Sequence, residues 1–352
     1  MRDIGRRRAL TGQLFPPGFY SRQQKNMRVG LLSRGEAAEF EWVRRLGFRS
    51  AGWIRFDTSA CAQPGADWQR AAEETAEAAA LEGLRISSIG ALYRNPLDPA
   101  QREQADFMFR RAIQVAAHIG IRTVCGFPGA VIRTRIHPRG GNPVYEPFEN
   151  HIPELLDFWA PLARVAADHG VRIGFEHCPQ GVWHLPVMGY NMMGQPAIWE
   201  RVFSESRSEN LGLEWDASHI VCQFIDPVAN ILKFGRRIYH VHAKDAWVNR
   251  PLLETYGPCH PGVTEHRFPG LGQSNWAQIV HALLRMGYDS DLTVEGWHDP
   301  VYRDHDRELP SDDTSLITGL QKGQKLEEAG LRIALNTLLP LVEGTEAPAN
   351  GG

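Results

Sequence analysis

The sequence has 352 residues and no run of about 18 apolar residues, the length that a membrane-spanning helix needs. Its five cysteines are odd in number and form no C-x-x-C pair, which excludes a disulfide framework and a thiolate zinc site. The formal net charge is only −3, so the composition indicates no basic surface for nucleic acid. No G-x-G-x-x-G follows the first apolar run, which argues against a dinucleotide-binding fold. We therefore expect a cytoplasmic protein without a membrane or nucleic-acid partner.

The composition is that of a globular protein, with 43% apolar and 22% charged residues. The first 26 residues are basic, and Pro16, Pro17 and Gly18 stand where an export signal needs an apolar stretch. We expect residues 1–26 to form a flexible leader or an arm that contacts another subunit. Residues 344–352 are mostly small and polar, and we expect a flexible tail there. Residues 27–343 then form the catalytic domain.

Short apolar runs alternate with longer segments of helical periodicity along this domain. Eight runs are predicted strands, at 28–32, 50–55, 84–90, 121–126, 171–176, 211–216, 238–242 and 291–295. The clearest helical segments separate or follow them, at 35–46, 68–82, 100–118, 153–168, 275–286 and 323–341. Eight strands that alternate with helices predict an α/β protein, a single (β/α)8 TIM barrel.

The lengths of the connections indicate where an active site lies. Links from a helix to the next strand are short, whereas four links from a strand to the next helix are long, at 127–150, 177–196, 243–273 and 296–320. In a (β/α)8 barrel these long links all belong to the carboxyl-terminal face, where barrel enzymes build their active sites.

The four predicted strands of the second half of the chain each end in a side chain that binds metals well: Glu176, Asp216, His242 and Glu295. Their apolar neighbours alternate with them, so we expect these four side chains to point into the barrel mouth. Three converging carboxylates repel one another unless a cation lies between them. Oxygen and imidazole ligands without thiolate predict one divalent ion, Mn²⁺ in the first place, with Mg²⁺ or Co²⁺ as alternatives.

Five segments resemble the xylose-isomerase-like superfamily of sugar isomerases and epimerases: GFEHCP (174–179), LGLEWDASHI (211–220), YHVHAKD (239–245), FPGLGQSNW (268–276) and LTVEGWHDP (292–300). The resemblance extends over residues 28–340. It implies that Glu176, Asp216, His242 and Glu295 bind one divalent metal ion. It also implies that His219 of the D-x-x-H motif contacts the substrate, and that the two glutamates act as paired acid and base.

The chemistry of these residue types agrees with that resemblance. A metal ion that binds a ketose carbonyl and the neighbouring hydroxyl stabilises the enediolate formed when the α-proton leaves. A carboxylate on each face of that plane can remove one proton and return another. Lys244 shares the inward face of its strand with His242, so its ammonium can assist the same oxyanion, unless it is simply an exposed loop lysine. We therefore expect a metal-dependent enzyme that abstracts a proton next to the carbonyl of a keto sugar.

Further candidates lie in the long connections. Arg267 precedes a P-G-L-G turn and is either a substrate anchor or a surface arginine. Trp183 and Trp297 can stack on a sugar or aglycone ring. His137 and His151 are alternative bases.

The chain departs from the compact epimerases in ways that predict a bulkier substrate. The connections 127–150 and 243–268 are long, and Val182 and Val248 stand near positions where those epimerases have polar substrate contacts. The superfamily also resembles the large subunits of deglycosidases that cleave 3-keto C-glycosides, where elimination of the aglycone follows proton abstraction. A sugar isomerase or epimerase is therefore the leading hypothesis, and a lyase with a separate small subunit is the alternative.

A DNA-repair endonuclease of the same barrel type is a remote alternative. Such enzymes need a three-metal cluster with further histidines, but the third predicted strand leads into Ala91, Leu92 and Tyr93, and no D-x-H occurs between 243 and 270. The expected partner is a sugar or glycoside substrate, and we expect the chain to form a homo-oligomer.

Overall fold

A computed structural model describes residues 27–91, 94–136, 143–179, 190–296, 299–302 and 324–343. Eight parallel strands close into a barrel, which confirms the predicted fold. Around the barrel they follow the order β1-β14-β11-β10-β8-β4-β3-β2. Their bounds are Val29–Ser33 (β1), Ser50–Trp53 (β2), Arg85–Gly90 (β3), Thr123–Gly126 (β4), Arg172–Glu176 (β8), Leu211–Asp216 (β10), Ile238–Ala243 (β11) and Leu292–Val294 (β14).

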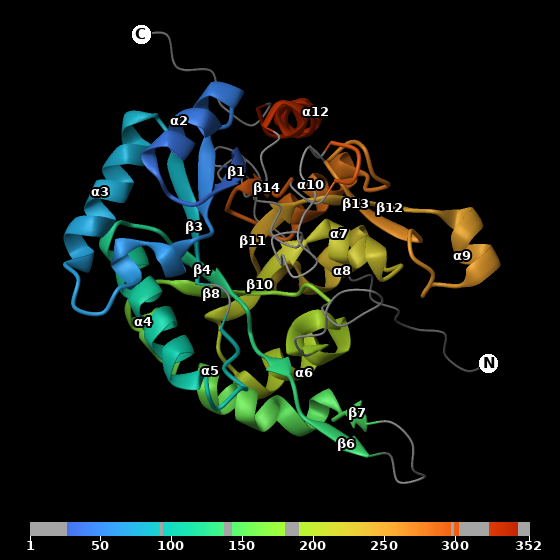
Figure 1. Ribbon diagram of the computed structural model, residues 1–352, viewed down its shortest axis with the longest axis horizontal. Coiled ribbons are helices and arrows are strands. Elements are labelled where there is room, and N and C mark those ends of the chain that lie inside the picture. Colours follow the sequence, from blue (N-terminus) through green and yellow to red (C-terminus); the bar gives the residue numbers. More distant parts are fainter. Residues whose placement is uncertain are drawn as a thin grey trace, which may run out of the picture.

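A helix follows each barrel strand, and these helices surround the barrel in Figure 1. Their bounds are Ala37–Leu46 (α2), Trp68–Leu81 (α3), Arg102–His118 (α4), Ile152–Asp168 (α5), Pro196–Ser206 (α6), Pro227–Phe234 (α8), Trp276–Arg285 (α10) and Gln324–Glu343 (α12). The predicted helical segments correspond to six of them, and the periodicity had not singled out α6 or α8. None of the described helices is long and apolar enough to cross a membrane.

Local sequence explains where several helices begin and end. Asp226 caps α8 by accepting a hydrogen bond from the backbone of Ala229, and Asn275 caps α10 in the same way through Gln278. Gly47 ends α2 with a left-handed φ of 103°, a conformation that costs glycine little. Such ends allow the short links between a helix and the next strand.

The long connections carry small antiparallel sheets of their own. Strand β5 (Ala130–Val131), which follows β4, pairs with β9 (Tyr190–Asn191), which follows β8. After β11, strands β12 (Asp245–Val248) and β13 (Thr264–Arg267) pair with each other and flank helix α9 (Arg250–Tyr256). We call residues 245–267 the arm, and Figure 1 shows it projecting from one side of the barrel. The predicted leader (1–26) and tail (344–352) lie outside the described residues.

The hydrophobic core lies between the barrel and its helices. Trp159 of α5 makes edge-to-face contacts with Phe109 of α4 and Phe175 of β8, at ring-centroid distances of 4.6 and 4.7 Å. Phe175 and Trp215 are fully buried, as the outward face of a strand requires. The inward face of the same strands is therefore free to carry polar residues.

Candidate metal centre

Asp216 ends β10 and at the same time caps the short helix α7 (Ala217–Cys222). Its Oδ1 accepts hydrogen bonds from the backbone N–H and the hydroxyl of Ser218, both at 2.7 Å. This cap fixes the rotation of the carboxylate. The other oxygen, Oδ2, is thereby held toward the centre of the barrel.

Three of the four predicted ligands come together at that point. Asp216, His242 and Glu295 each offer one ligand atom, and these atoms lie within 4.8 Å of one another. His242 Nδ1 is 3.1 Å from Glu295 Oε2. All three side chains are buried. Glu295 directly follows β14, which ends one residue earlier than the predicted strand.

A divalent cation fits this cluster. Atoms that share one ion at 2.0–2.4 Å lie at most about 4.8 Å apart, as these do. Asp216 Oδ2 and His242 Nδ1 are buried, with Lys244 Nζ 3.0 Å from the first and Glu295 Oε2 3.1 Å from the second. Two carboxylates held this close together at such depth need positive charge between them, which a bound cation can supply. The donor set, two carboxylates and an imidazole, suits Mn²⁺, Mg²⁺ or Co²⁺.

Glu176 ends β8 and reaches the same region through His219. The His219 Nε2 atom lies 3.3 Å from Asp216 Oδ2 and 3.8 Å from Glu176 Oε1. The ligand atoms of Glu176 group with His219 and Cys178 rather than with the other three predicted ligands. The structure therefore brings together Asp216, His242 and Glu295, and groups Glu176 with His219 and Cys178 instead.

Lys244 is fully buried and contacts the centre directly. Its Nζ atom is 3.0 Å from Asp216 Oδ2 and 3.0 Å from Glu295 Oε1. Burial lowers the pKa of Lys244, but the negative charges of Asp216 and Glu295 outweigh this and raise it above its ordinary value. Lys244 is thus a cation at the centre.

The histidine and the carboxylate of the D-x-x-H motif stabilise each other's charge. Burial lowers the pKa of His219, but Asp216 outweighs it and raises this pKa to about 10. Burial raises the pKa of Asp216, but His219 and Lys244 hold it below its usual range. The centre therefore combines anionic carboxylates with the cationic side chains of Lys244 and His219 in a buried space.

Glu214 is a residue of this centre that the sequence analysis missed. It lies on β10 two residues before Asp216, so both face the barrel interior. Its Oε1 accepts a hydrogen bond from His242 Nε2 at 2.9 Å. Burial raises the pKa of Glu214, but the contact with His242 outweighs it and lowers the pKa. The signal was present in the alternation of L-G-L-E-W-D, in which we had considered only the last residue.

His266 was also missed. It lies on β13 of the arm, and its ring makes an edge-to-face contact with His219 at 5.4 Å. The arm thus brings a second imidazole beside the D-x-x-H histidine. The spacing of the sequence carries no signal for this contact, because it depends on how β13 folds back along β12.

The remaining predicted site residues have other neighbours or lie outside the described residues. Arg267 Nε binds Asp299 Oδ2 at 2.9 Å, and the Asp299 side chain is fully buried. His151 is buried at the start of α5, 3.0 Å from Glu146 and 2.7 Å from an Arg133 nitrogen. Both side chains are thus paired with residues other than the three clustered ligands. The predicted site residues His137, Trp183 and Trp297 lie outside the described residues.

The last residue of the H-x-K-D motif (residues 242–245), Asp245, stabilises the fold. Asp245 is buried and accepts hydrogen bonds from the backbone of Ser274 and from the indole N–H of Trp276. A Cβ at Gly272 would lie 2.2 Å from Asp245 Oδ1, so only glycine allows this approach. The P-G-L-G turn (residues 269–272) therefore packs closely against the Asp245 carboxylate.

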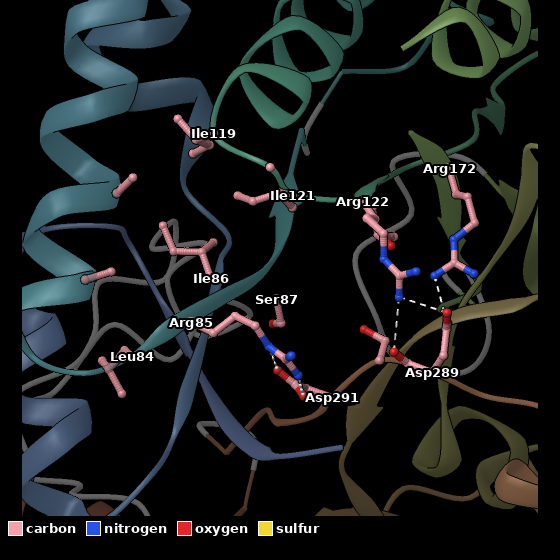
Figure 2. A pocket seen from close by; sticks show the side chains of 15 residues that line it. Leu84, Arg85, Ile86, Ser87, Ile119, Ile121, Arg122, Arg172, Asp289 and Asp291 are labelled. Carbon is pink, nitrogen blue, oxygen red and sulfur yellow. Dashed lines mark hydrogen bonds and ion pairs between the residues drawn. The ribbon is translucent and has the colours of Figure 1, made fainter. Parts of the chain in front are cut away.

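A cavity of about 460 Å³ opens at the amino-terminal ends of the strands (Figure 2). Arg85 forms an ion pair with Asp291, and Arg122 and Arg172 lie 2.8 and 3.1 Å from Asp289. Each guanidinium, at the start of β3, β4 or β8, thus binds a carboxylate of the segment that leads into β14, a strand that is not its neighbour in the barrel. This end lies opposite the ligand-bearing strand ends, and its ion pairs stabilise the closure of the barrel.

Comparisons with known proteins agree with the barrel fold. A family model described as the xylose isomerase-like TIM barrel matches residues 40–318. Protein MJ1311 of Methanocaldococcus jannaschii is 27% identical over 165 residues, 44% of this chain and 48% of that protein. Inosose dehydratase of Clostridium beijerinckii is 29% identical over 151 residues, 42% of this chain and 47% of the relative. The chain therefore matches about half the length of these curated relatives.

A solved structure extends the likeness over most of the fold. The 3-keto-D-glucoside 4-epimerase of E. coli superimposes with a TM-score of 0.59 and 14% identity, over 88% of this chain and 99% of that one. At this identity the likeness is one of fold. The family model, however, matches well over half of the sequence, and we conclude that the chain belongs to the xylose isomerase-like TIM barrel family.

Proposed function

We propose that this protein is a divalent-metal-dependent enzyme that removes a proton from the carbon next to the carbonyl of a keto sugar. Epimerisation or isomerisation of the sugar is the proposed outcome. The observation that carries the proposal is the buried cluster of Asp216, His242 and Glu295, whose ligand atoms lie within 4.8 Å of one another. Family membership supports the choice of a sugar as substrate.

The proposed metal ligands are Asp216, His242 and Glu295, with Glu176 as the fourth. Mn²⁺ is the proposed ion, and Mg²⁺ or Co²⁺ would suit the same oxygen and nitrogen donors. The bound ion would supply a Lewis acid for the carbonyl and hydroxyl oxygens of the sugar.

The protein's own side chains supply the proton transfers in this proposal. In the order of the barrel strands, Glu176 on β8 and Glu295 after β14 flank the two strands that carry Asp216 and His242. Two carboxylates that approach from different sides can remove a proton from one face of the sugar and return it to the other. The Lys244 ammonium can donate to the oxygen on which negative charge develops. His219, whose Nε2 atom lies 3.8 Å from Glu176 Oε1, would bind a sugar hydroxyl in this proposal.

Elimination is the second candidate outcome, and two observations favour it. One relative is named as a dehydratase of inosose, and loss of water beside a carbonyl begins with the same proton abstraction. The arm also places His266 beside His219, where an additional acid can protonate a leaving group. In this version the substrate is a 3-keto glycoside and a separate small subunit completes the enzyme. A homo-oligomer remains our proposal for the assembly of the chain itself.

A substrate screen tests the proposed function. The Mn²⁺-loaded protein is incubated with free ketoses, phosphorylated ketoses, 3-keto sugars and a 3-keto glycoside, and products are identified by chromatography and mass spectrometry. We expect an epimer or isomer of one keto sugar, or an unsaturated keto sugar with a released aglycone. Asp216→Asn is the inactive control. Turnover that persists in Asp216→Asn, or activity only on substrates without a carbonyl, would refute the proposal.

A further inference from the structure

Glu214 lies at the bottom of the metal centre and belongs to none of the predicted ligand positions. It stands on β10 beside Glu176 of β8 and His240 of β11 in the strand register. Only 3% of its surface is exposed. A carboxylate at such depth costs much free energy unless charged or hydrogen-bonded partners compensate it. Its partners therefore indicate why it is there.

The main partner of Glu214 is the proposed imidazole ligand. Glu214 Oε1 is 2.9 Å from His242 Nε2, and Cys125 provides a further hydrogen bond to the carboxylate. The opposite ring nitrogen, His242 Nδ1, faces Glu295 and belongs to the cluster with Asp216. One imidazole thus has a carboxylate acceptor on its inner side and the ligand cluster on its outer side.

This arrangement decides which nitrogen of His242 keeps a proton. A neutral imidazole carries its proton on the nitrogen that donates a hydrogen bond, and the other nitrogen then presents its lone pair. His242 Nδ1 lies 3.1 Å from Glu295, and when an ion binds the cluster this nitrogen would give its lone pair to the ion. Nε2 would then keep the proton that Glu214 accepts. A carboxylate behind a histidine ligand also makes the imidazole a stronger donor.

Glu214 is not itself placed as a ligand of a second ion. Glu214, His240 and His242 also form a compact group of three ligand atoms. In that group His242 Nε2 already donates to Glu214, and His240 Nε2 lies 3.2 Å from the hydroxyl of Ser88. Because His242 Nε2 holds the proton that it donates to Glu214, it offers no lone pair to a second ion.

From this geometry we propose that Glu214 is a positioning residue of the metal centre, which holds the Nε2–H form of His242 and thereby strengthens metal binding through Nδ1. The inference rests on the proposed metal centre and adds to it a residue that binds neither metal nor substrate. Removal of such a carboxylate typically weakens metal binding by about 10–100-fold.

Metal titration of matched variants tests the inference without any substrate. The chelator-treated protein is titrated with Mn²⁺ by calorimetry as wild type, Glu214→Gln and Ser88→Ala. Ser88→Ala is the control because it removes an equally buried hydrogen bond, to His240 rather than to His242. We expect one ion per chain in the wild type, about 10–100-fold weaker binding in Glu214→Gln, and an unchanged affinity in Ser88→Ala.

The outcomes separate this inference from the proposed function. If the wild type binds Mn²⁺ and the affinity of Glu214→Gln is within threefold of the wild-type affinity, the positioning role is overturned and the proposed metal centre is not. Two ions in the wild type and one in Glu214→Gln would show that Glu214 is a ligand, and would also overturn the inference. No Mn²⁺ binding by the wild type would overturn both proposals.

A second measurement needs no variant that might misfold. In the Mg²⁺-loaded wild type, long-range ¹H–¹⁵N spectra of ¹⁵N-histidine-labelled protein report which nitrogen of His242 carries the proton. We expect the proton on Nε2 and the lone pair of Nδ1 bound to the ion. A proton on Nδ1 would overturn the inference.

Discussion

Lys244→Met gives the most informative perturbation of the centre, because it removes a cation and keeps most of the side-chain volume. In the metal-free protein the Lys244 ammonium is 3.0 Å from both Asp216 and Glu295, and all three groups are buried. The variant leaves two carboxylates close together without their shared cation. Removal of one partner from a buried ion pair costs about 3–5 kcal/mol, because the remaining charge is uncompensated.

Thermal unfolding with and without metal measures this effect. We expect Lys244→Met to unfold on the order of 10 °C below the wild type when metal-free. Mn²⁺ should restore much of that loss, because the ion brings positive charge to the same carboxylates. The rise in melting temperature on addition of Mn²⁺ should therefore be larger for Lys244→Met than for the wild type.

Lys233→Met is the matched control. Lys233 forms an exposed ion pair with Glu200 on the outer helices, and such pairs contribute about 0–1 kcal/mol. If Lys244→Met lowers the melting temperature no more than Lys233→Met does, the ion pairs of Lys244 with Asp216 and Glu295 do not stabilise the metal-free protein as proposed. If Mn²⁺ stabilises the wild type and Lys244→Met equally, the ion does not bind at these carboxylates.

Three further predictions concern the two ends of the barrel. Asp216→Asn should lose Mn²⁺ on gel filtration while His219→Ala retains it, and elemental analysis that finds metal loss in His219→Ala would identify His219 as a ligand. Gly272→Ala should lower the melting temperature because its Cβ collides with Asp245, and unchanged stability would contradict that contact. Burial raises the pKa of Asp289, but the positive charges of Arg172 and Arg122 outweigh burial and lower this pKa. The Asp289 carboxylate therefore stabilises the folded protein above its unfolded pKa of about 3.9, and this stabilisation is lost as the pH falls below that value. Denaturant unfolding should thus show a stability deficit of Asp289→Asn at pH 7 that shrinks below about pH 4, and a constant deficit would refute the assignment.

The barrel was predictable because the apolar runs, the helical periodicity and the short helix-to-strand links all indicate the same fold. Eight β-branched runs alternate with helical periodicities, and glycines such as Gly47 and Gly287 shorten the returns from helix to strand. Helix α6 escaped prediction because it follows the long connection after β8, and α8 escaped because it has only 8 residues. Their existence follows from the topology rather than from a strong periodic signal.

The centre was predictable where it depends on strand alternation. The inward phase of Asp216 and His242 follows from two-residue periodicity, and the structure brings both beside Glu295. The same rule would have placed Glu214 inside the barrel. The ion pair of Arg267 with Asp299 and the contact of His266 with His219 could not be predicted, because both depend on how connections far apart in the sequence fold together.

Cleavage of a C–H bond next to a carbonyl is the central claim, and an isotope experiment tests it most directly. The keto sugar identified by the screen is prepared with deuterium at the α-carbon and followed in a single turnover of the Mn²⁺-loaded enzyme. We predict a primary isotope effect, with deuterium lost to solvent or transferred to another position. Deuterium that stays on its original carbon, with no isotope effect on the rate, would contradict the proposed proton abstraction.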